Sequence, residues 1–148
     1  MPKVMFLMIK GYRMHELGMG KAEKLCSRTA IGRLFAAGES SVAYPLRMVA
    51  GESGRQTGAP AQFMITVPKK KIRKAVGRVL MRRRIREAYR LNRKLFVPQL
   101  EASGKKIDIA FVYLAADFSD YQLIERKMKK LLGSLGSKYN AENNEQLV

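Results

Sequence analysis

The chain has 148 residues, of which 29 are Lys or Arg and 12 are Asp or Glu, so its formal net charge is +17 at pH 7. An apolar content of 47% argues against a disordered basic tail and predicts one folded domain with a single hydrophobic core. Such a charge concentrates anions at the surface, which makes nucleic acid the first candidate partner and an anionic membrane surface the second.

The single cysteine, Cys26, and the single histidine, His15, exclude several kinds of site. One cysteine allows no intrachain disulfide and leaves no disulfide partner, which fits a reducing compartment and predicts a cytoplasmic location. A structural zinc site made from Cys and His needs about four ligands, more than this chain contains. The acidic residues are scattered, with no pair suited to general acid–base work, so neither a catalytic residue nor a protein-bound metal ion is predicted.

The first half of the chain is predicted to hold a helix and two strands. Residues 1–16 are expected to be an irregular extension, and their apolar run of six residues is far shorter than the roughly 20 needed to span a bilayer. A helix is expected within 21–37, with Ser27 as its N-cap residue. Strands are expected at 41–50 and 62–67, and a hairpin across the intervening loop is the simplest connection between them.

The last third of the chain is predicted to be a strand followed by a helix. The strand is expected at 106–114, where apolar residues alternate. Those on one face are Ile107, Ile109, Phe111 and Tyr113. An amphipathic helix then runs from an N-cap at Ser119 to Leu135, and the absence of an apolar period after it predicts a flexible tail at 137–148. These elements predict a single α/β domain over 17–136, in an α+β sandwich with helices packed on a small sheet.

The strongest feature is the stretch from Lys69 to Lys94, which holds 13 of the 29 basic residues and one of the 12 acidic ones. A helix face selected only for solubility would mix both signs. On a helical wheel, arginines gather on one side, with Tyr89 beside them, and apolar residues on the other. The arginine side consists of Arg78, Arg82, Arg86, Arg90 and Arg93, and the apolar side of Leu80, Met81, Ile85, Ala88, Leu91 and Leu95. This stretch therefore predicts a helix with one face in the core and one face that meets a polyanion.

The composition of the charged face favours RNA over a membrane. The planar guanidinium of arginine pairs with phosphate through two hydrogen bonds and stacks on bases. The apolar side carries few large aromatic residues, unlike a helix that lies on a membrane surface, so no membrane partner is predicted. Charge alone leaves open a general RNA-binding protein, such as a ribosomal protein or an RNA chaperone.

The segment from Phe63 to Arg90 resembles the signature of the bacterial ribonuclease P protein component. That signature is a strand ending in Val, a Lys-Lys turn and a basic helix of pattern K-x-V-x-R-N-x-x-K-R-x-x-R-E. The matching residues are Lys74, Val76, Arg78, Arg83, Arg86 and Glu87, with Arg82 for the usual lysine. The flanking elements agree in order, so the resemblance covers roughly Leu17 to Leu135. It departs in one place, because the family's central Arg-Asn-Arg is here Arg78-Val79-Leu80.

The resemblance implies both a fold and a function. The fold is a two-layer α/β sandwich of the ribosomal protein S5 domain 2 type, with a small central sheet and a left-handed βαβ crossover through the basic helix, an exception to the right-handed rule. The function is that of an accessory subunit of the endonuclease that removes the 5′ leader of precursor tRNA. Catalysis then belongs to an RNA subunit and its Mg²⁺ ions, and the partners are that RNA subunit and precursor tRNA.

The resemblance also assigns roles to residues by position. The expected RNA-binding residues are Lys69, Lys70, Lys71, Lys74, Arg78, Arg82, Arg83, Arg86 and Arg90. Three residues on the strands, Tyr44, Phe63 and Ile65, are expected to contact the single-stranded leader, since aromatic side chains stack on bases. Core packing is the alternative for these three side chains.

Overall fold

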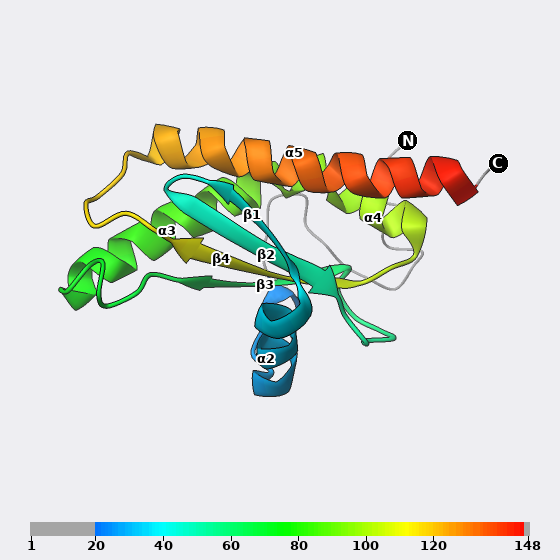
Figure 1. Cartoon of the computed structure of the whole chain (residues 1–148), viewed down its shortest axis with the longest axis horizontal. Helices are drawn as coiled ribbons and strands as arrows, with labels where there is room; N and C mark the ends of the chain where they lie inside the picture. The colour runs from blue at the N-terminus through cyan, green and yellow to red at the C-terminus, as the bar shows by residue number, and fades with distance from the viewer. Residues whose placement is uncertain (1–19, 147–148) are drawn as a thin grey trace.

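A computed structural model describes residues 20–146 of the chain, so the predicted extension at 1–16 lies outside the described residues. The elements in chain order are η1 (Lys21–Glu23), α2 (Arg28–Ala37), β1 (Glu39–Ala43), β2 (Leu46–Glu52), β3 (Ala61–Thr66), α3 (Ala75–Asn92), η2 (Arg93–Leu95), α4 (Val97–Ser103), β4 (Ile107–Tyr113) and α5 (Tyr121–Gln146). Figure 1 shows α5 running along the sheet and α2 projecting from the opposite side. As predicted, the Ser27 hydroxyl oxygen caps α2 by accepting a hydrogen bond from the Ala30 N–H.

The four strands form one sheet in the order β1-β2-β4-β3. Strand β4 pairs with β2 in the antiparallel sense and with β3 in the parallel sense. The predicted hairpin between the strands at 41–50 and 62–67 is therefore wrong, because β4, which is buried on both faces, takes the central position between them. The chain returns from β3 to its parallel neighbour β4 through α3 and α4, which is the predicted crossover through the basic helix. Its left hand stays a prediction.

The first predicted strand is two strands. A tight turn at Tyr44 and Pro45, with a cis peptide bond between them, separates β1 from β2. The two strands pair as an antiparallel hairpin, in which Ala43 lies opposite Leu46. Strand β1 is an outer strand of the sheet, so Pro45, which has no N–H to donate, lies at the edge, where a proline is tolerated.

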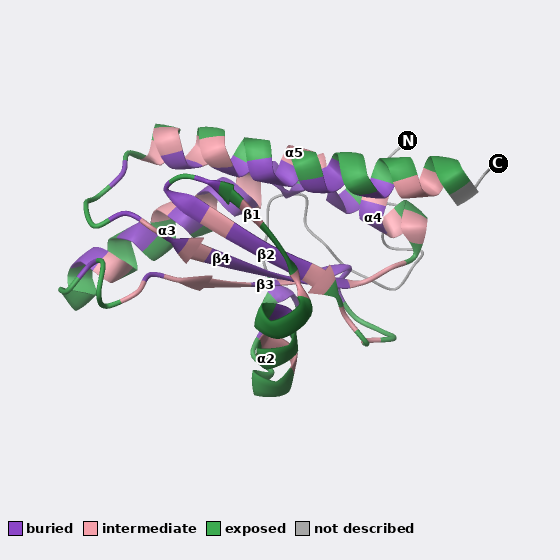
Figure 2. Cartoon of the chain, in the orientation of Figure 1, coloured by how far each residue is buried: buried purple, intermediate pink, exposed green. Residues whose placement is uncertain are grey.

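The main core lies between the sheet and the helices α3, α4 and α5 (Figure 2). The period-two and 3.6-residue patterns predict it well, since the residues they select in β4 and most of those in α3 are fully buried. These are Ile107, Ile109, Phe111 and Tyr113 from β4, and Met81, Ile85 and Ala88 from α3. A smaller cluster covers part of the opposite face of the sheet, where Leu34 of α2 packs with Val49 and Ala110. The predicted two-layer sandwich thus describes the main core, and α2 adds to it on the other side.

Helix α5 continues to Gln146, so its predicted end at Leu135 is wrong. Gly136 lies where the helix touches the backbone of η2, since a Cβ atom there would fall within 2.1 Å of the Leu95 carbonyl oxygen. Tyr139, almost one turn further along, is only 3% exposed. The apolar stripe of α5 therefore continues past residue 135. The sequence pattern does not show this, because Gly136 stands where the next apolar side chain would be expected.

Two other features near the helix ends differ from the predictions. Ser119 does not cap α5, because its hydroxyl lies 2.8 Å from the Tyr113 hydroxyl and the helix begins at Tyr121. The short helix α4 was not predicted, because Pro98 reads as a stop signal but in fact occupies the first turn, where its missing N–H costs nothing.

Within residues 20–146, no helix has both the length and the apolar character needed to cross a bilayer.

Candidate nucleic-acid interface

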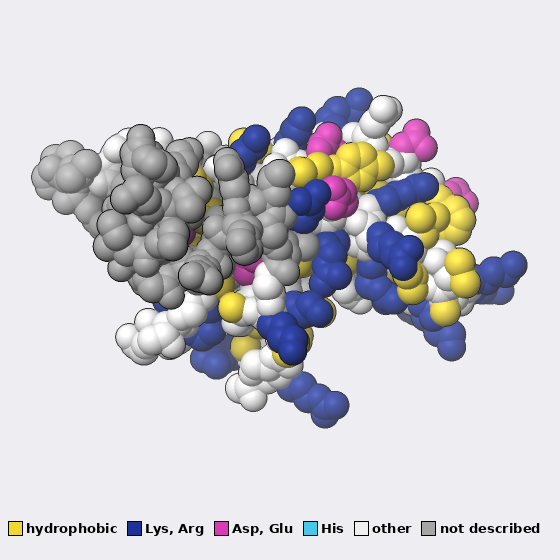
Figure 3. Space-filling view, turned by 180° about the vertical axis from the view of Figure 1, so that it is seen from behind, with side chains coloured by type: hydrophobic (Ala, Val, Ile, Leu, Met, Phe, Trp, Pro, Cys, Tyr) yellow, Lys and Arg dark blue, Asp and Glu magenta, His cyan; other side chains and the backbone are white. Residues whose placement is uncertain are grey.

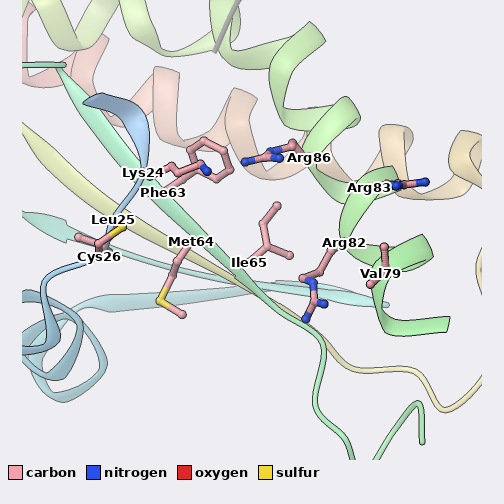
Figure 4. Close-up of a pocket in the computed structure, with 10 residues that line it drawn as sticks. All are labelled: Lys24, Leu25, Cys26, Phe63, Met64, Ile65, Val79, Arg82, Arg83 and Arg86. Carbon is pink, nitrogen blue, oxygen red and sulfur yellow. The ribbon is translucent and has the colours of Figure 1, made fainter. Parts of the chain in front are cut away.

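A groove of about 380 Å³ opens between β3 and the middle of α3 (Figure 4). Its third wall is the segment 24–26, which follows the outer edge of β3: the Leu25 N–H donates to the Phe63 carbonyl oxygen at 2.9 Å. The lining combines apolar side chains with cations. The apolar members are Leu25, Phe63, Met64, Ile65 and Val79, the cations are Lys24, Arg82, Arg83 and Arg86, and Cys26 completes the set.

Helix geometry explains why two of the predicted arginines, Arg82 and Arg86, face this groove, and a third, Arg83, lines it from the same helix. Met81 and Ile85 are fully buried and fix the rotation of α3. Arg82 and Arg86 are one residue further along and four residues apart, so they share one side of the helix beside β3. In Figure 4, Arg86 extends toward β3 whereas Arg83 points away from it. These three, named here the groove arginines, are exposed and make no hydrogen bond or ion pair with another described residue.

The predicted lysines lie in the turn that connects β3 to α3. Lys69, Lys70 and Lys71 are exposed, and Lys74 occupies the N-cap position of α3. The turn is anchored by Ile72, which is buried and whose N–H donates to the Pro68 carbonyl oxygen. Because this turn joins the two elements that flank the groove, its ammonium groups lie at one end of it.

Two predicted RNA-binding arginines bind the protein itself. The Arg78 guanidinium donates to the carbonyl oxygens of Ile72 and Arg73, at 3.0 and 2.6 Å, and so holds the turn before α3. The Arg90 guanidinium donates to the Glu87 carboxylate at 2.6 Å. That hydrogen bond lowers the pKa of the Glu87 carboxyl. Neither guanidinium is presented to solvent in the way that the groove arginines are.

Arg93 requires a correction, because the helical wheel placed it on the exposed arginine side. It is 2% exposed, and its Nη1 lies 2.6 Å from Oε1 of Glu23, which is itself buried. The other carboxylate oxygen of Glu23 accepts a hydrogen bond from the Gly20 N–H at 3.3 Å. The ion pair therefore ties η1 to η2, and with it the segment 24–26 that forms the third wall of the groove.

The helical wheel also predicts the burial of two further residues wrongly. Leu80, predicted in the core, is 37% exposed, and Tyr89, predicted beside the arginines, is fully buried. The Tyr89 ring stacks on Phe63 with a centroid distance of 4.3 Å. The buried side of α3 is rotated toward Tyr89 because the helix packs against the edge strand β3 as well as against α5.

The three residues expected to contact the leader lie in different places. Phe63 and Ile65 both line the groove, although Phe63 is only 5% exposed and belongs mainly to the core. Tyr44 is 63% exposed in the turn between β1 and β2, and it does not line the groove, because β1 and β3 are opposite edges of the sheet. The structure thus brings together two of the three.

Sequence reasoning missed the wall at 24–26 and the contributions of Met64 and Val79. Lys24 pairs with Phe63 as an isolated parallel bridge, a long-range contact with no local pattern to mark it. Among residues 20–146, no group of three or more His, Cys, Asp or Glu side chains is placed to hold a metal ion. The site is therefore a cationic groove with an apolar lining, suited to a ligand that has both phosphates and flat apolar faces.

Comparisons with known proteins agree with this reading. Residues 19–136 match the family model for ribonuclease P. The chain is 36% identical over 115 residues to the ribonuclease P protein component of Porphyromonas gingivalis, in strains W83 and ATCC 33277, covering 78% of this chain and 84% of the relative.

Solved structures show the same fold at lower identity. The RNase P protein from Thermotoga maritima superposes with a TM-score of 0.61 at 21% identity, covering 76% of this chain and 96% of that one. The RNase P protein from Staphylococcus aureus gives a TM-score of 0.60 at 19% identity, with 76% and 94% coverage. The mixed α and β architecture built around the groove is thus shared with both proteins.

Proposed function

The chain belongs to the ribonuclease P protein family, and on that basis we propose that it binds the RNA subunit of ribonuclease P and the 5′ leader of precursor tRNA. The turn lysines and the groove arginines are assigned to the phosphates of these RNAs. The family match argues against the alternative of a ribosomal protein or an RNA chaperone. A cytoplasmic location is part of this proposal.

One observation carries the proposal: the groove arginines have no hydrogen-bond or ion-pair partner within residues 20–146, and they lie beside an apolar lining. Arg82 and Arg86 are free to pair with phosphates, and Ile65 and Met64 offer apolar contact to bases. Proteins that bind single strands combine these same two features, a cationic track for the backbone and an apolar or aromatic surface for the bases. The groove therefore supports the leader as its ligand, with Ile65 as a contact and Phe63 as the support beneath it.

We place the hydrolysis of the phosphodiester bond on the RNA subunit and its Mg²⁺ ions. The residues of this chain bind and position the RNAs, and they reduce the repulsion between two polyanions that must approach each other. This role is expected to matter most when Mg²⁺ is scarce, because the divalent ion otherwise screens the same phosphates.

The test is a reconstituted cleavage reaction. The full chain is added to the ribonuclease P RNA of Porphyromonas gingivalis with precursor tRNA at low Mg²⁺, and release of the leader is measured. We expect the protein to stimulate cleavage, and the double variant R82A/R86A to stimulate it much less while unfolding at the same urea concentration as the wild type. Failure of the wild-type chain to stimulate cleavage at any protein concentration would overturn the proposal. Unrelated structured RNA serves as a competitor, and equal competition would point back to a general RNA-binding protein.

A further inference from the structure

An exposed apolar band crosses the first turns of α3, next to the groove. It consists of Val76, Val79 and Leu80 of α3 and Phe118 of the loop between β4 and α5, which are 82%, 38%, 37% and 58% exposed. Single exposed apolar side chains are ordinary, but a cluster of them indicates a contact surface. Figure 3 shows hydrophobic side chains exposed among Lys and Arg side chains at the end of the molecule where α3 begins.

The Phe118 ring is held against α3. A Cβ atom on Gly77 would lie 2.9 Å from two of its ring carbons, so the ring fills the space that a side chain would need. The next residue is fixed as well, because the Ser119 carbonyl oxygen accepts a hydrogen bond from Arg84 at 2.6 Å and its hydroxyl contacts Tyr113. The ring is therefore preorganised in a residue that stays exposed to a ligand, which lowers the entropic cost of binding.

The band is continuous with the groove. Val76 and Leu80 are four residues apart and lie along one side of the helix, and Val79 lies beside them. Val79 also lines the groove together with Arg82 and Arg86. An RNA strand that occupies the groove can therefore reach the band without crossing other surface.

The charge around the band identifies the chemistry of its partner. The segments that carry or border it, 69–84 and 115–120, contain nine Lys or Arg residues and two Asp residues, Asp117 and Asp120. The lysines of the turn before α3 are exposed. An apolar surface inside a cationic border is complementary to a ligand with flat apolar faces and negative charge, which is the description of an unpaired nucleotide.

We propose that the apolar band is a stacking surface for an unpaired base of the ribonuclease P RNA subunit, with Phe118 as the platform and the turn lysines on the neighbouring phosphates. This inference rests on the proposed function and adds a contact outside the groove. Where the family pattern has Asn and Arg, this chain has Val79 and Leu80. Stacking and apolar contact then take the place of the hydrogen bonds that those two side chains would supply.

Salt dependence distinguishes a stacking contact from a phosphate contact. Each lost phosphate contact flattens the slope of log K against log salt by roughly 0.7 to 0.9, because fewer counterions are released. A stacked base releases none. Removing the platform therefore lowers the affinity at every salt concentration by the same factor and leaves the slope unchanged.

The experiment measures binding of the full chain to the isolated ribonuclease P RNA subunit across a salt series. We expect F118A to bind about 5- to 150-fold more weakly, the range for the loss of one base stack, with an unchanged slope. F118Y keeps the ring and should bind like the wild type. Leu80→Ala, on the helix surface, should weaken binding in the same direction without affecting the fold. Val42→Ala is the matched control, since Val42 is 61% exposed on the distant strand β1.

Three results would overturn the inference. One is wild-type affinity in both F118A and L80A, and another is a flattened salt slope in F118A. The third is a dimer of the free wild-type chain in sedimentation that F118A dissociates, which would make the band an interface between two copies. Failure of the wild-type chain itself to bind the RNA subunit would instead refute the proposed function, so the two failures are distinguishable.

Discussion

Seven arginines between residues 78 and 93 divide into two groups that the sequence does not distinguish. The groove arginines, Arg82, Arg83 and Arg86, are exposed and have no partner among the described residues. The other four are held by protein oxygens and are named here the bound arginines. They are Arg78, Arg84, Arg90 and Arg93. A dense run of cations thus indicates a polyanion partner, whereas the position of each side chain in the fold decides which of the cations are available to that partner.

Substitutions in the two groups should change different measured properties of the protein. A bound arginine has already given up side-chain freedom to a protein partner on folding, and Arg93 is buried as well, so removal of a bound arginine is expected to change the stability of the protein, most of all at Arg93. A groove arginine remains hydrated in the free protein, so its removal changes RNA binding and the salt dependence of that binding. Substitutions in each group therefore separate stability from function.

The largest effect is expected from Arg93→Ala. This change leaves the Glu23 carboxylate buried without its cation, which should cost about 3 to 5 kcal/mol of unfolding free energy. Urea unfolding measures the loss, and Arg82→Ala is the matched control, expected within about 0.5 kcal/mol of the wild type. A loss below about 1 kcal/mol for Arg93→Ala would show that the buried pair does not support the fold.

The packing that holds η2 gives the next largest effect. Gly136→Ala places a Cβ atom against the Leu95 carbonyl oxygen and pushes α5 away from η2, which carries Arg93. The overpacking should cost about 1 to 3 kcal/mol in urea unfolding. Gly133 is in the same helix with open space around its Cβ position, so Gly133→Ala should stabilise the protein by roughly 0.5 to 1 kcal/mol. Equal effects at the two positions would contradict the close contact at Gly136.

Groove arginines should give a smaller change, visible only with RNA. Arg82→Ala and Arg86→Ala should each flatten the slope of log K against log salt by roughly 0.7 to 0.9 for binding to the RNA subunit. Filter binding across a salt series measures this, with Arg84→Ala as the control because its guanidinium is held by the Ser119 carbonyl oxygen. A slope change in Arg84→Ala as large as that in Arg82→Ala would remove the distinction between the two groups.

The smallest effect concerns the pair of Glu87 and Arg90 at the surface. Because Arg90 lowers the pKa of the Glu87 carboxyl below its ordinary value of 4.5, the pair stabilises the protein above that pH, and this contribution is lost as the pH falls through the lowered pKa. Glu87→Gln should therefore be slightly less stable than the wild type at neutral pH and equal to it in strong acid. Urea unfolding over a pH series from 7 into acid compares them, and a difference that does not shrink as the pH falls would show that the charge of Glu87 is not the cause.

Much of the core could be predicted from the sequence because it follows local periodicity. The alternation through Ile107 and Phe111 and the helical spacing of Met81 and Ile85 depend on the geometry of one element at a time. The helical wheel also placed Arg82 and Arg86 together on the surface. The family resemblance rested on the same local pattern and was confirmed by the family match.

The rest depends on contacts between distant parts of the chain. Strand β4 pairs with both β2 and β3, and the residue pattern of a single strand does not indicate which other strands it will pair with. The ion pair of Glu23 with Arg93 joins residues far apart in the sequence, and nothing in either local pattern marks Arg93 as buried. Val79 was noted only as a departure from the family pattern, and its place in both the groove and the apolar band follows from the packing of α3 beside β3.

The position of Cys26 allows a probe of the groove to be attached to the natural sequence. It is the single thiol of the chain, it is exposed, and it lies in the wall of the groove. A fluorophore or spin label attached through that sulfur would be placed uniformly, at one known point beside the groove, without introducing any substitution. Protection of the thiol from alkylation would likewise report when the groove is occupied, in the same molecules whose activity is being measured.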